Sequence, residues 1–234
     1  MFTEVPHSEP TKMRVNKIAM SADDTSGLEQ VLPPLPRKAS AMAFIGAPSS
    51  GKTNLMVSLL RVKGKFYNRV FEYVYWMSPS TNTLKDLGLP ADRVFRDLDM
   101  ALLQQWINEL QSDERGLFVI DDLVGDIRRN SKALLKNLRN RRHLGKGTSW
   151  WISSQKWNSL ELAIRTSLSQ VFIFRTDNMK ERQALANELS NWDFEKFNAL
   201  LEYAWQQPYD FLYVDLTKPV NKRFHRNFNV INIQ

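Results

Sequence analysis

An eight-residue motif constrains what this chain can fold into more strongly than any other part of its sequence. Residues 46–53 read GAPSSGKT, and Gly, four residues, Gly, Lys and Thr form the pattern of a phosphate-binding loop. Residues 41–45 (AMAFI) are typical of a short buried strand, and Thr53 to Val62 predict a helix. The order of strand, glycine loop and helix puts a candidate nucleotide site at the start of that helix. A surface turn that matches by chance is the alternative, and both flanking elements disfavour it.

The residues of this loop are expected to share the contacts to a bound triphosphate. Backbone N–H groups of the loop and the helix dipole face the phosphates, Lys52 reaches the β and γ phosphates, and the Thr53 hydroxyl binds Mg²⁺. We therefore expect ATP and Mg²⁺ as cofactors. The candidate nucleotide-binding residues are Gly46, Ala47, Pro48, Ser49, Ser50, Gly51, Lys52, Thr53 and Asn54.

Length and composition bound the class of protein. A chain of 234 residues is long enough for one α/β domain with a well-buried core. Residues 1–39 contain five prolines and little apolar periodicity, so we expect a tail or strap outside the core, with residues 40–234 forming the nucleotide-binding domain. The absence of cysteine excludes disulfides and cysteine-bound zinc, and the three histidines are too scattered for a metal cluster. The sequence has neither an apolar run of about 18 residues nor a signal peptide, which predicts a soluble intracellular protein.

The remaining sequence pattern alternates strands with helices. Strands are predicted at 69–77, 116–122, 148–154, 170–175 and 210–216, and helices at 98–110, 179–189 and 194–205. Such alternation predicts the α/β class, with a parallel sheet covered by helices on both faces.

Two adjacent carboxylates end one of these strands. Residues 116–122 read GLFVIDD, an apolar run followed by two acids, which is the pattern of a Walker B strand. Asp121 is expected at the carboxyl end of the strand, where it would hold Mg²⁺ directly or through its waters. Asp122 is placed to polarise an attacking water as general base. Capping of a following helix is the alternative role for such acids.

A polar residue also follows the strand predicted at 148–154 (TSWWISS). This residue is Gln155, and an amide at the end of a buried strand can orient water or sense a γ-phosphate. Trp150, Trp151 and Trp157 would suit stacking on nucleic-acid bases, but aromatic residues in a strand more often belong to the core.

Positive charge is concentrated in two stretches. Residues 127–146 hold eight Lys and Arg residues and no acid, and on one helix four of them share a side: Arg128, Lys132, Lys136 and Arg139. The lack of acids favours a surface that faces DNA phosphates over a merely solvated face. Residues 218–229 interleave basic and aromatic residues, which suits either DNA contact or an edge strand with an exposed turn. The net charge of +7 is compatible with a nucleic-acid partner.

With these motifs in order, the chain resembles the genome-packaging ATPases of large double-stranded DNA viruses and virophages, within the FtsK/HerA superfamily of P-loop motor proteins. Four features over roughly residues 40–230 carry the resemblance. They are GAPSSGKT at 46–53, FVIDDL at 118–123, the triplet Arg141-Arg142-His143, and Ser153-Ser154-Gln155 at the end of the following strand. The chain departs from the commonest superfamily pattern in having Asp122 where many members have Glu.

This resemblance implies a fold and a set of site residues. The implied fold is a P-loop NTPase of the ASCE or RecA-like kind, with three layers, a mainly parallel central sheet, and the strand 148–154 between the P-loop and Walker B strands. Lys52 and Asp122 would be catalytic, and Gln155 would act as the sensor. Arg141 or Arg142, with Arg165 as a third candidate, would be the finger that reaches the nucleotide of a neighbouring subunit.

The resemblance also implies an activity and partners. The implied function is an ATP-driven double-stranded DNA translocase that packages a viral genome into a preformed capsid. Its partners would be DNA, further copies in a ring of five or six subunits, and capsid vertex proteins, in the host cytoplasm, a viral factory or the virion. A P-loop kinase for nucleotides or small molecules and an ATP-switched DNA-binding module without significant turnover are the alternatives.

Overall fold

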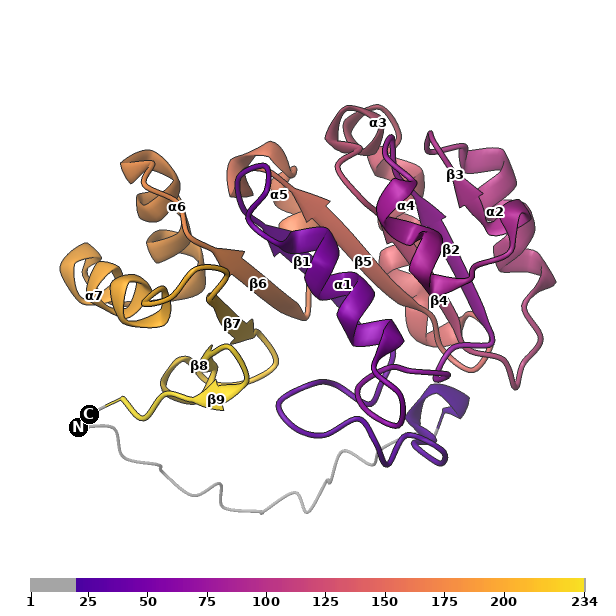
Figure 1. Cartoon of the computed structure of the whole chain (residues 1–234), viewed down its shortest axis with the longest axis horizontal. Coiled ribbons are helices and arrows are strands. Elements are labelled where there is room, and N and C mark those ends of the chain that lie inside the picture. The colour runs from indigo at the N-terminus through magenta and orange to yellow at the C-terminus, as the bar shows by residue number, and fades with distance from the viewer. Residues whose placement is uncertain (1–19, 234) are drawn as a thin grey trace, which may run out of the picture.

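The computed structural model describes residues 20–233, which form a nine-stranded sheet covered by helices on both faces (Figure 1). The strands are β1 Ala41–Ile45, β2 Tyr73–Met77, β3 Val94–Phe95, β4 Gly116–Ile120, β5 Ser149–Ser154, β6 Gln170–Phe174, β7 Phe211–Asp215, β8 Phe224–Arg226 and β9 Asn229–Val230. The α-helices are α1 Lys52–Arg61, α2 Met100–Glu109, α3 Val124–Arg129, α4 Ser131–Asn140, α5 Leu162–Arg165, α6 Met179–Leu189 and α7 Phe194–Ala204. Short 3-10 helices include η1 Ser21–Asp23, η2 Asn82–Leu87, η3 Ala91–Arg93, η4 Arg141–His143, η5 Trp157–Ser159 and η6 Val220–Lys222.

The order of the strands across the sheet confirms the predicted fold class. The order is β3-β2-β4-β5-β1-β6-β7-β8-β9, in which the first six strands run parallel and β7, β8 and β9 each pair antiparallel with the strand before them. Strand β5 therefore lies between β1, which leads into the phosphate-loop motif, and β4, which leads into the two acids. The carboxyl ends of β1, β4, β5 and β6 meet at one edge of the sheet, where ligands of open α/β sheets bind.

Alternating side chains of the buried strands supply two separate apolar cores. In β1, Ala41, Ala43 and Ile45 contribute to the core under helices α2 to α7, whereas Met42 and Phe44 face the core under α1. The neighbouring tryptophans of β5 divide in the same way and are fully buried, as is Trp157. These aromatic side chains belong to the core and do not form a surface for stacking on nucleic acid.

Residues 20–39 lie against the sheet as a strap, and the expectation that this stretch lies outside the core is wrong for its described half. In Figure 1 the strap, coloured indigo, runs below α1. Its buried apolar side chains, which join the core under α1, are Leu28, Val31 and Leu35. The Tyr67 hydroxyl donates to Pro36 O and the Tyr213 hydroxyl to Pro34 O, both over 2.9 Å. Prolines prevent regular structure here without preventing burial. Residues 1–19 lie outside the described residues.

The basic stretch 127–146 is not one helix. Asn130 separates α3 from α4, with φ −110° and ψ 14°, and its side-chain amide donates to Asp126 O over 3.0 Å, which caps the end of α3. Arg128 consequently lies on α3 and donates to Ser159 O over 3.0 Å, whereas Lys132, Lys136 and Arg139 lie on α4. The predicted four-residue stripe is therefore corrected to three residues on α4 and one on a different helix.

Candidate nucleotide site

The GAPSSGKT segment joins β1 to α1 as a compact loop, and its own side chains define the inside of that loop. The Lys52 ammonium is buried and donates to Gly46 O over 2.7 Å and to Ala47 O over 2.9 Å. A Cβ at Gly46 would lie 2.6 Å from Ser50 Oγ and 2.7 Å from Phe174 Cβ, so only glycine fits there. Gly51, at φ 102°, is the N-cap residue of α1.

Polar groups without protein partners converge inside this loop. No side chain caps the first turn of α1, and the Ser50 hydroxyl is buried without a hydrogen-bond partner among residues 20–233. Uncapped N–H groups, a helix amino end and a buried hydroxyl beside an ammonium form the environment that phosphate oxygens need. The loop thus fits a nucleotide triphosphate by its own chemistry.

Asp121 lies directly after β4, and its side chain links the end of this strand to α1 and to β5. Its carboxylate accepts a 2.9 Å hydrogen bond from the Thr53 hydroxyl and a second hydrogen bond from the Ser153 hydroxyl. Only 4 % of Asp121 is exposed, and this burial raises the pKa of its carboxyl group, against the lowering effect of the two hydroxyl bonds. A buried carboxylate paired with a hydroxyl is an oxygen donor set of the kind that Mg²⁺ prefers, so Asp121 and Thr53 fit the metal predicted for them.

Ser153 positions both acids, a role that the sequence motifs do not indicate. Besides donating to Asp121, its hydroxyl accepts a 2.9 Å hydrogen bond from the backbone N–H of Asp122. The side chain is fully buried in β5, on the same face of the sheet as Trp151. A hydroxyl within a buried strand is the sequence signal that could have identified it.

Asp122 is exposed beside Gln155, at the ends of the neighbouring strands β4 and β5. The Gln155 side-chain amide donates to both carboxylate oxygens of Asp122, over 3.2 and 3.0 Å. Asp122 has φ 59°, in the left-handed region that Asp and Asn tolerate better than Glu. This backbone conformation is a physical reason for Asp in place of the commoner Glu.

The Lys52 ammonium lies within the electrostatic reach of both acids. Burial lowers the pKa of Lys52, and the charges of Asp122 and Asp121 act in the opposite direction. The mutual attraction across the loop holds one positive and two negative groups at a single edge of the sheet, where they can bind a metal-complexed polyphosphate.

Arg141 and Arg142 lie at the opposite edge of the sheet. They belong to η4, just before β5, and Thr148 N donates to Arg141 O over 2.8 Å. Six residues of β5 separate this edge from Gln155, which is about 20 Å and beyond the reach of an arginine side chain. Burial, followed by the charge of Arg142, lowers the pKa of the Arg141 guanidinium, which donates to Leu138 O over 2.8 Å. These arginines cannot reach the phosphate loop of their own subunit.

The other arginine candidate is engaged within its own subunit. Arg165 forms a two-point ion pair with Glu188, with nitrogen–oxygen distances of 2.9 and 2.7 Å, and donates to Leu160 O over 2.7 Å. Its side chain is only 12 % exposed. Arg165 therefore stabilises the packing of α5 on α6.

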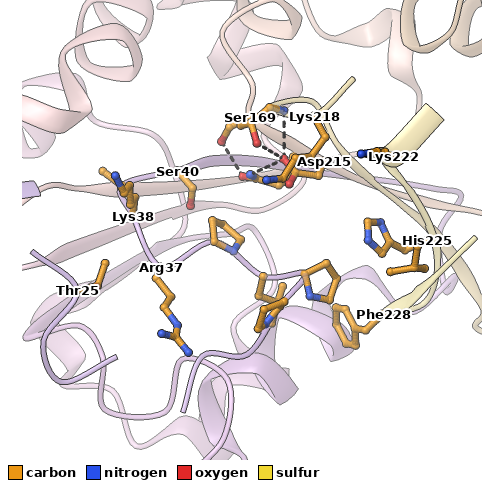
Figure 2. A pocket seen from close by; sticks show the side chains of 18 of the residues that line it. Thr25, Arg37, Lys38, Ser40, Ser169, Asp215, Lys218, Lys222, His225 and Phe228 are labelled. Carbon is orange, nitrogen blue, oxygen red and sulfur yellow. Dashed lines mark hydrogen bonds between the residues drawn. The ribbon is translucent and has the colours of Figure 1, made fainter. Parts of the chain in front are cut away.

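A cleft of about 840 Å³ lies at the same edge as Arg141 and Arg142, between the strap and residues 217–230, which include β8 and β9 and are called the C-terminal hairpin below (Figure 2). Figure 2 shows Arg37 and Lys38 on the strap side and Lys218 and Lys222 on the hairpin side. Of the two alternatives for residues 218–229, the structure has the edge strands β8 and β9. Lys218, Lys222 and His225 from this stretch nevertheless line the cleft.

Comparison with known proteins supports the fold. No protein-family model matches the chain, and no curated protein sequence matches it. Among solved structures, the genome packaging NTPase B204 from Sulfolobus turreted icosahedral virus 2, in complex with AMPPCP, has a TM-score of 0.57 and 17 % identity, over 76 % of this chain and 93 % of that chain. EssC (ATPases 2 and 3) from Geobacillus thermodenitrificans has a TM-score of 0.51 and 11 % identity, over 75 % of this chain and 37 % of that chain.

These similarities define the class of protein to which the fold and the site point. The chain has the fold of P-loop NTPases, and it shares that fold with a viral genome-packaging enzyme across most of its length. The resemblance inferred from the motifs is confirmed at the level of fold. B204 has also been solved with sulfate, AMP and ATP-gammaS. None of the helices within residues 20–233 is long and apolar enough to cross a membrane.

Proposed function

We propose that the protein is an ATPase that drives double-stranded DNA into a preformed viral capsid. The observation that carries the proposal is the pairing of Thr53 with Asp121 and of Gln155 with Asp122 at one edge of the sheet. This edge combines the phosphate loop, the side chains of Thr53 and Asp121 that would bind the metal, and Asp122 as a general base beside an amide side chain. These are the parts that ATP hydrolysis requires. The genome-packaging role is supported by the likeness to B204.

In this mechanism the protein binds the phosphates and directs a water. Loop N–H groups and Lys52 would hold the β and γ phosphates, and Thr53 and Asp121 would hold Mg²⁺, which supplies charge neutralisation on the phosphate oxygens. The Gln155 amide would orient the attacking water and Asp122 would accept its proton. The new oxygen–phosphorus bond forms as the bond to the bridging oxygen of ADP breaks, and ADP and phosphate leave.

An arginine from an adjacent subunit would complete this site. Arg141 and Arg142 lie too far from their own loop, so either one can act only on the nucleotide of another subunit in a ring of five or six copies. An arginine that reaches the γ-phosphate in this way increases the turnover rate by a factor of about 10³ to 10⁵. In the isolated subunit Arg142 pairs with Asp23 over 3.1 Å, so a role in trans requires this surface ion pair to exchange.

Complementation between two inactive variants tests this role. An Arg141/Arg142 double-Ala variant and a Lys52→Ala variant should each be nearly inactive alone. Mixed rings would contain interfaces that pair an intact loop with an intact arginine, so hydrolysis should partly return. Mixed rings that form without any return of activity would refute the assignment in trans.

DNA would contact the exposed basic residues of α3 and α4 through its phosphates. The proposed contacts are Arg128, Lys132, Lys136 and Arg139, all of which are exposed. Contacts to phosphates carry no base-sequence information, so binding should depend steeply on salt and weakly on sequence. Capsid vertex proteins and a place of action in the host cytoplasm, a viral factory or the virion belong to the same proposal.

The experiment that tests the proposed function is the stimulation of phosphate release by duplex DNA. The packaging ATPase should hydrolyse ATP faster with DNA than without it, and Lys52→Ala should abolish both rates. A P-loop kinase would transfer phosphate to an acceptor and ignore DNA. An ATP-switched binding module would bind both ligands with negligible phosphate release.

A further inference from the structure

Tyr209 lies against the phosphate loop although it is distant from that loop in the sequence. A Cβ built on Gly51 would be 3.2 Å from Tyr209 Cδ1 and 3.9 Å from Tyr209 Cβ, so the tyrosine ring lies beside Gly51, just before α1. The residue is nevertheless 70 % exposed. An aromatic ring that lies beside the nucleotide loop and presents most of its surface to solvent is available to a ligand.

The backbone at Tyr209 is strained in a way that burial does not offset. Its φ is 68°, a conformation that is unfavourable for a bulky aromatic residue. Ser49 in the loop and Asp122 at the acids also have positive φ, so three of the six such non-glycine residues within 20–233 surround this one site. Strained residues of this kind concentrate at ligand clamps. Because the Tyr209 ring is exposed, burial of its apolar surface contributes little to the stability that would offset the strained backbone. This indicates that the ring serves to bind a ligand.

Asp210 fixes the turn that presents Tyr209. Its carboxylate accepts hydrogen bonds from Gln207 N over 3.0 Å, from Arg226 Nη2 over 2.9 Å and from Asn227 Nδ2 over 2.8 Å. Partial burial alone would raise the pKa of Asp210, but these bonds outweigh it and lower the pKa. The turn between α7 and β7 is thus held in place from the C-terminal hairpin, and the ring is presented without a ligand.

The strand order places Tyr209 on the side of the loop opposite the catalytic acids. Asp121, Asp122 and Gln155 follow β4 and β5 on one side of β1, whereas Tyr209 leads into β7 beyond β6 on the other side. A triphosphate whose γ end faces the acids extends its remaining part away from them. The sugar and the base would therefore emerge on the β6–β7 side.

We propose that Tyr209 forms the nucleobase subsite, with its ring stacked on the base of the bound nucleotide. This inference rests on the proposed function, because it assigns one part of the same nucleotide site. Stacking uses the π face that every base has and reads no hydrogen-bonding edge. The subsite should thus hold adenine and guanine similarly. Single bases stacked on aromatic residues typically gain a factor of about 5 to 150 in affinity.

The test compares a nucleotide with a ligand that has phosphates and no base. Calorimetry would measure binding of AMPPCP and of inorganic tripolyphosphate to wild type, Tyr209→Phe and Tyr209→Gly. Glycine accepts φ 68° without strain, so the Tyr209→Gly variant should fold with an unchanged or higher melting temperature. Tyr203→Ala provides a control, since Tyr203 is also an exposed tyrosine, 52 % accessible, on the adjacent α7.

The expected result is a loss of binding affinity in one variant only and for one ligand only. Tyr209→Gly should weaken AMPPCP binding by about 5- to 150-fold and leave tripolyphosphate binding unchanged, while Tyr209→Phe and Tyr203→Ala should bind both ligands like wild type. Equal weakening of both ligands would show that the ring only supports Gly51, and unchanged AMPPCP binding would show that no stacking occurs. Either result overturns the inference. Wild type that binds neither ligand would instead overturn the proposed function, and the subsite with it.

Discussion

Replacement of Asp122 by Asn separates the binding of ATP from its hydrolysis. The Asn side chain has the same shape and tolerates φ 59° as well as Asp does. Asp122 is exposed, so the free energy of unfolding should change by less than about 0.5 kcal/mol. One of the two Gln155 contacts, at 3.2 and 3.0 Å, would then face an amide nitrogen and be lost, because Asn offers a single acceptor oxygen.

The chemical cost follows from the loss of the proton acceptor. A neutral amide cannot take the proton of the attacking water, and a positioned general base contributes about 10² to 10⁴ in rate. The barrier should therefore rise by about 2.7 to 5.5 kcal/mol. Lys52 and the loop N–H groups are untouched, so affinity for ATP should stay near the wild-type value.

Two measurements on one preparation check this prediction. Single-turnover phosphate release reports the chemical step, and fluorescence titration with a slowly hydrolysed ATP analogue reports binding. Asp126→Asn is the matched control, because Asp126 lies four residues further along and pairs with Arg129 on the surface. Near-wild-type turnover in Asp122→Asn would mean that another group accepts the proton. Loss of binding together with turnover would mean that Asp122 supports the site and does not act as its base.

Three further predictions address the loop, the DNA surface and the base of the C-terminal hairpin. Gly46→Ala should abolish ATP binding and destabilise the fold by about 1 to 3 kcal/mol because its Cβ has no room, whereas Gly125→Ala, with no atom within 4 Å, should be neutral in thermal unfolding. Charge reversal at Lys132 and Lys136 should reduce the slope of log affinity for duplex DNA against log salt by about 0.9 per lost contact; an unchanged slope would mean that α4 does not face DNA. Because the pKa of Asp210 is lowered in the folded state, its ionised carboxylate stabilises the fold above the ordinary carboxyl pKa, and this contribution is lost as the pH falls through the pKa of the folded state. In urea titrations between about pH 5 and pH 2, the free energy of unfolding of wild type should therefore fall more than that of Asp210→Asn.

The parts of the fold set by local pattern could be predicted from the sequence. The loop motif fixes its flanking strand and helix, and apolar runs identify β4, β5 and β6 because buried parallel strands are apolar on both faces. Helix α6 was predicted at 179–189 and is found at Met179–Leu189. The position of β5 between β1 and β4 could be expected only from the resemblance, since hydrophobic pattern does not specify the order of strands.

The features that depend on contacts distant in the sequence could not be predicted. The break between α3 and α4 depends on the hydrogen bond from the Asn130 side-chain amide to Asp126 O. Burial of the strap depends on the hydroxyls of Tyr67 and Tyr213, which donate to the carbonyl oxygens of its prolines. The sequence does not indicate a role for Tyr209. Its proposed role depends on its position beside Gly51 and on its positive φ, and no local sequence pattern specifies either of them.

Displacement of a third strand from triplex DNA tests the central claim most directly, because only a protein that moves along a duplex can remove it. A translocase should release the labelled third strand with ATP, fail to do so with AMPPCP, and lose this activity in Lys52→Ala. The rate of release should fall as the duplex between the loading end and the triplex is lengthened. ATP hydrolysis at the wild-type rate without any release of the third strand would contradict a motor that drives DNA.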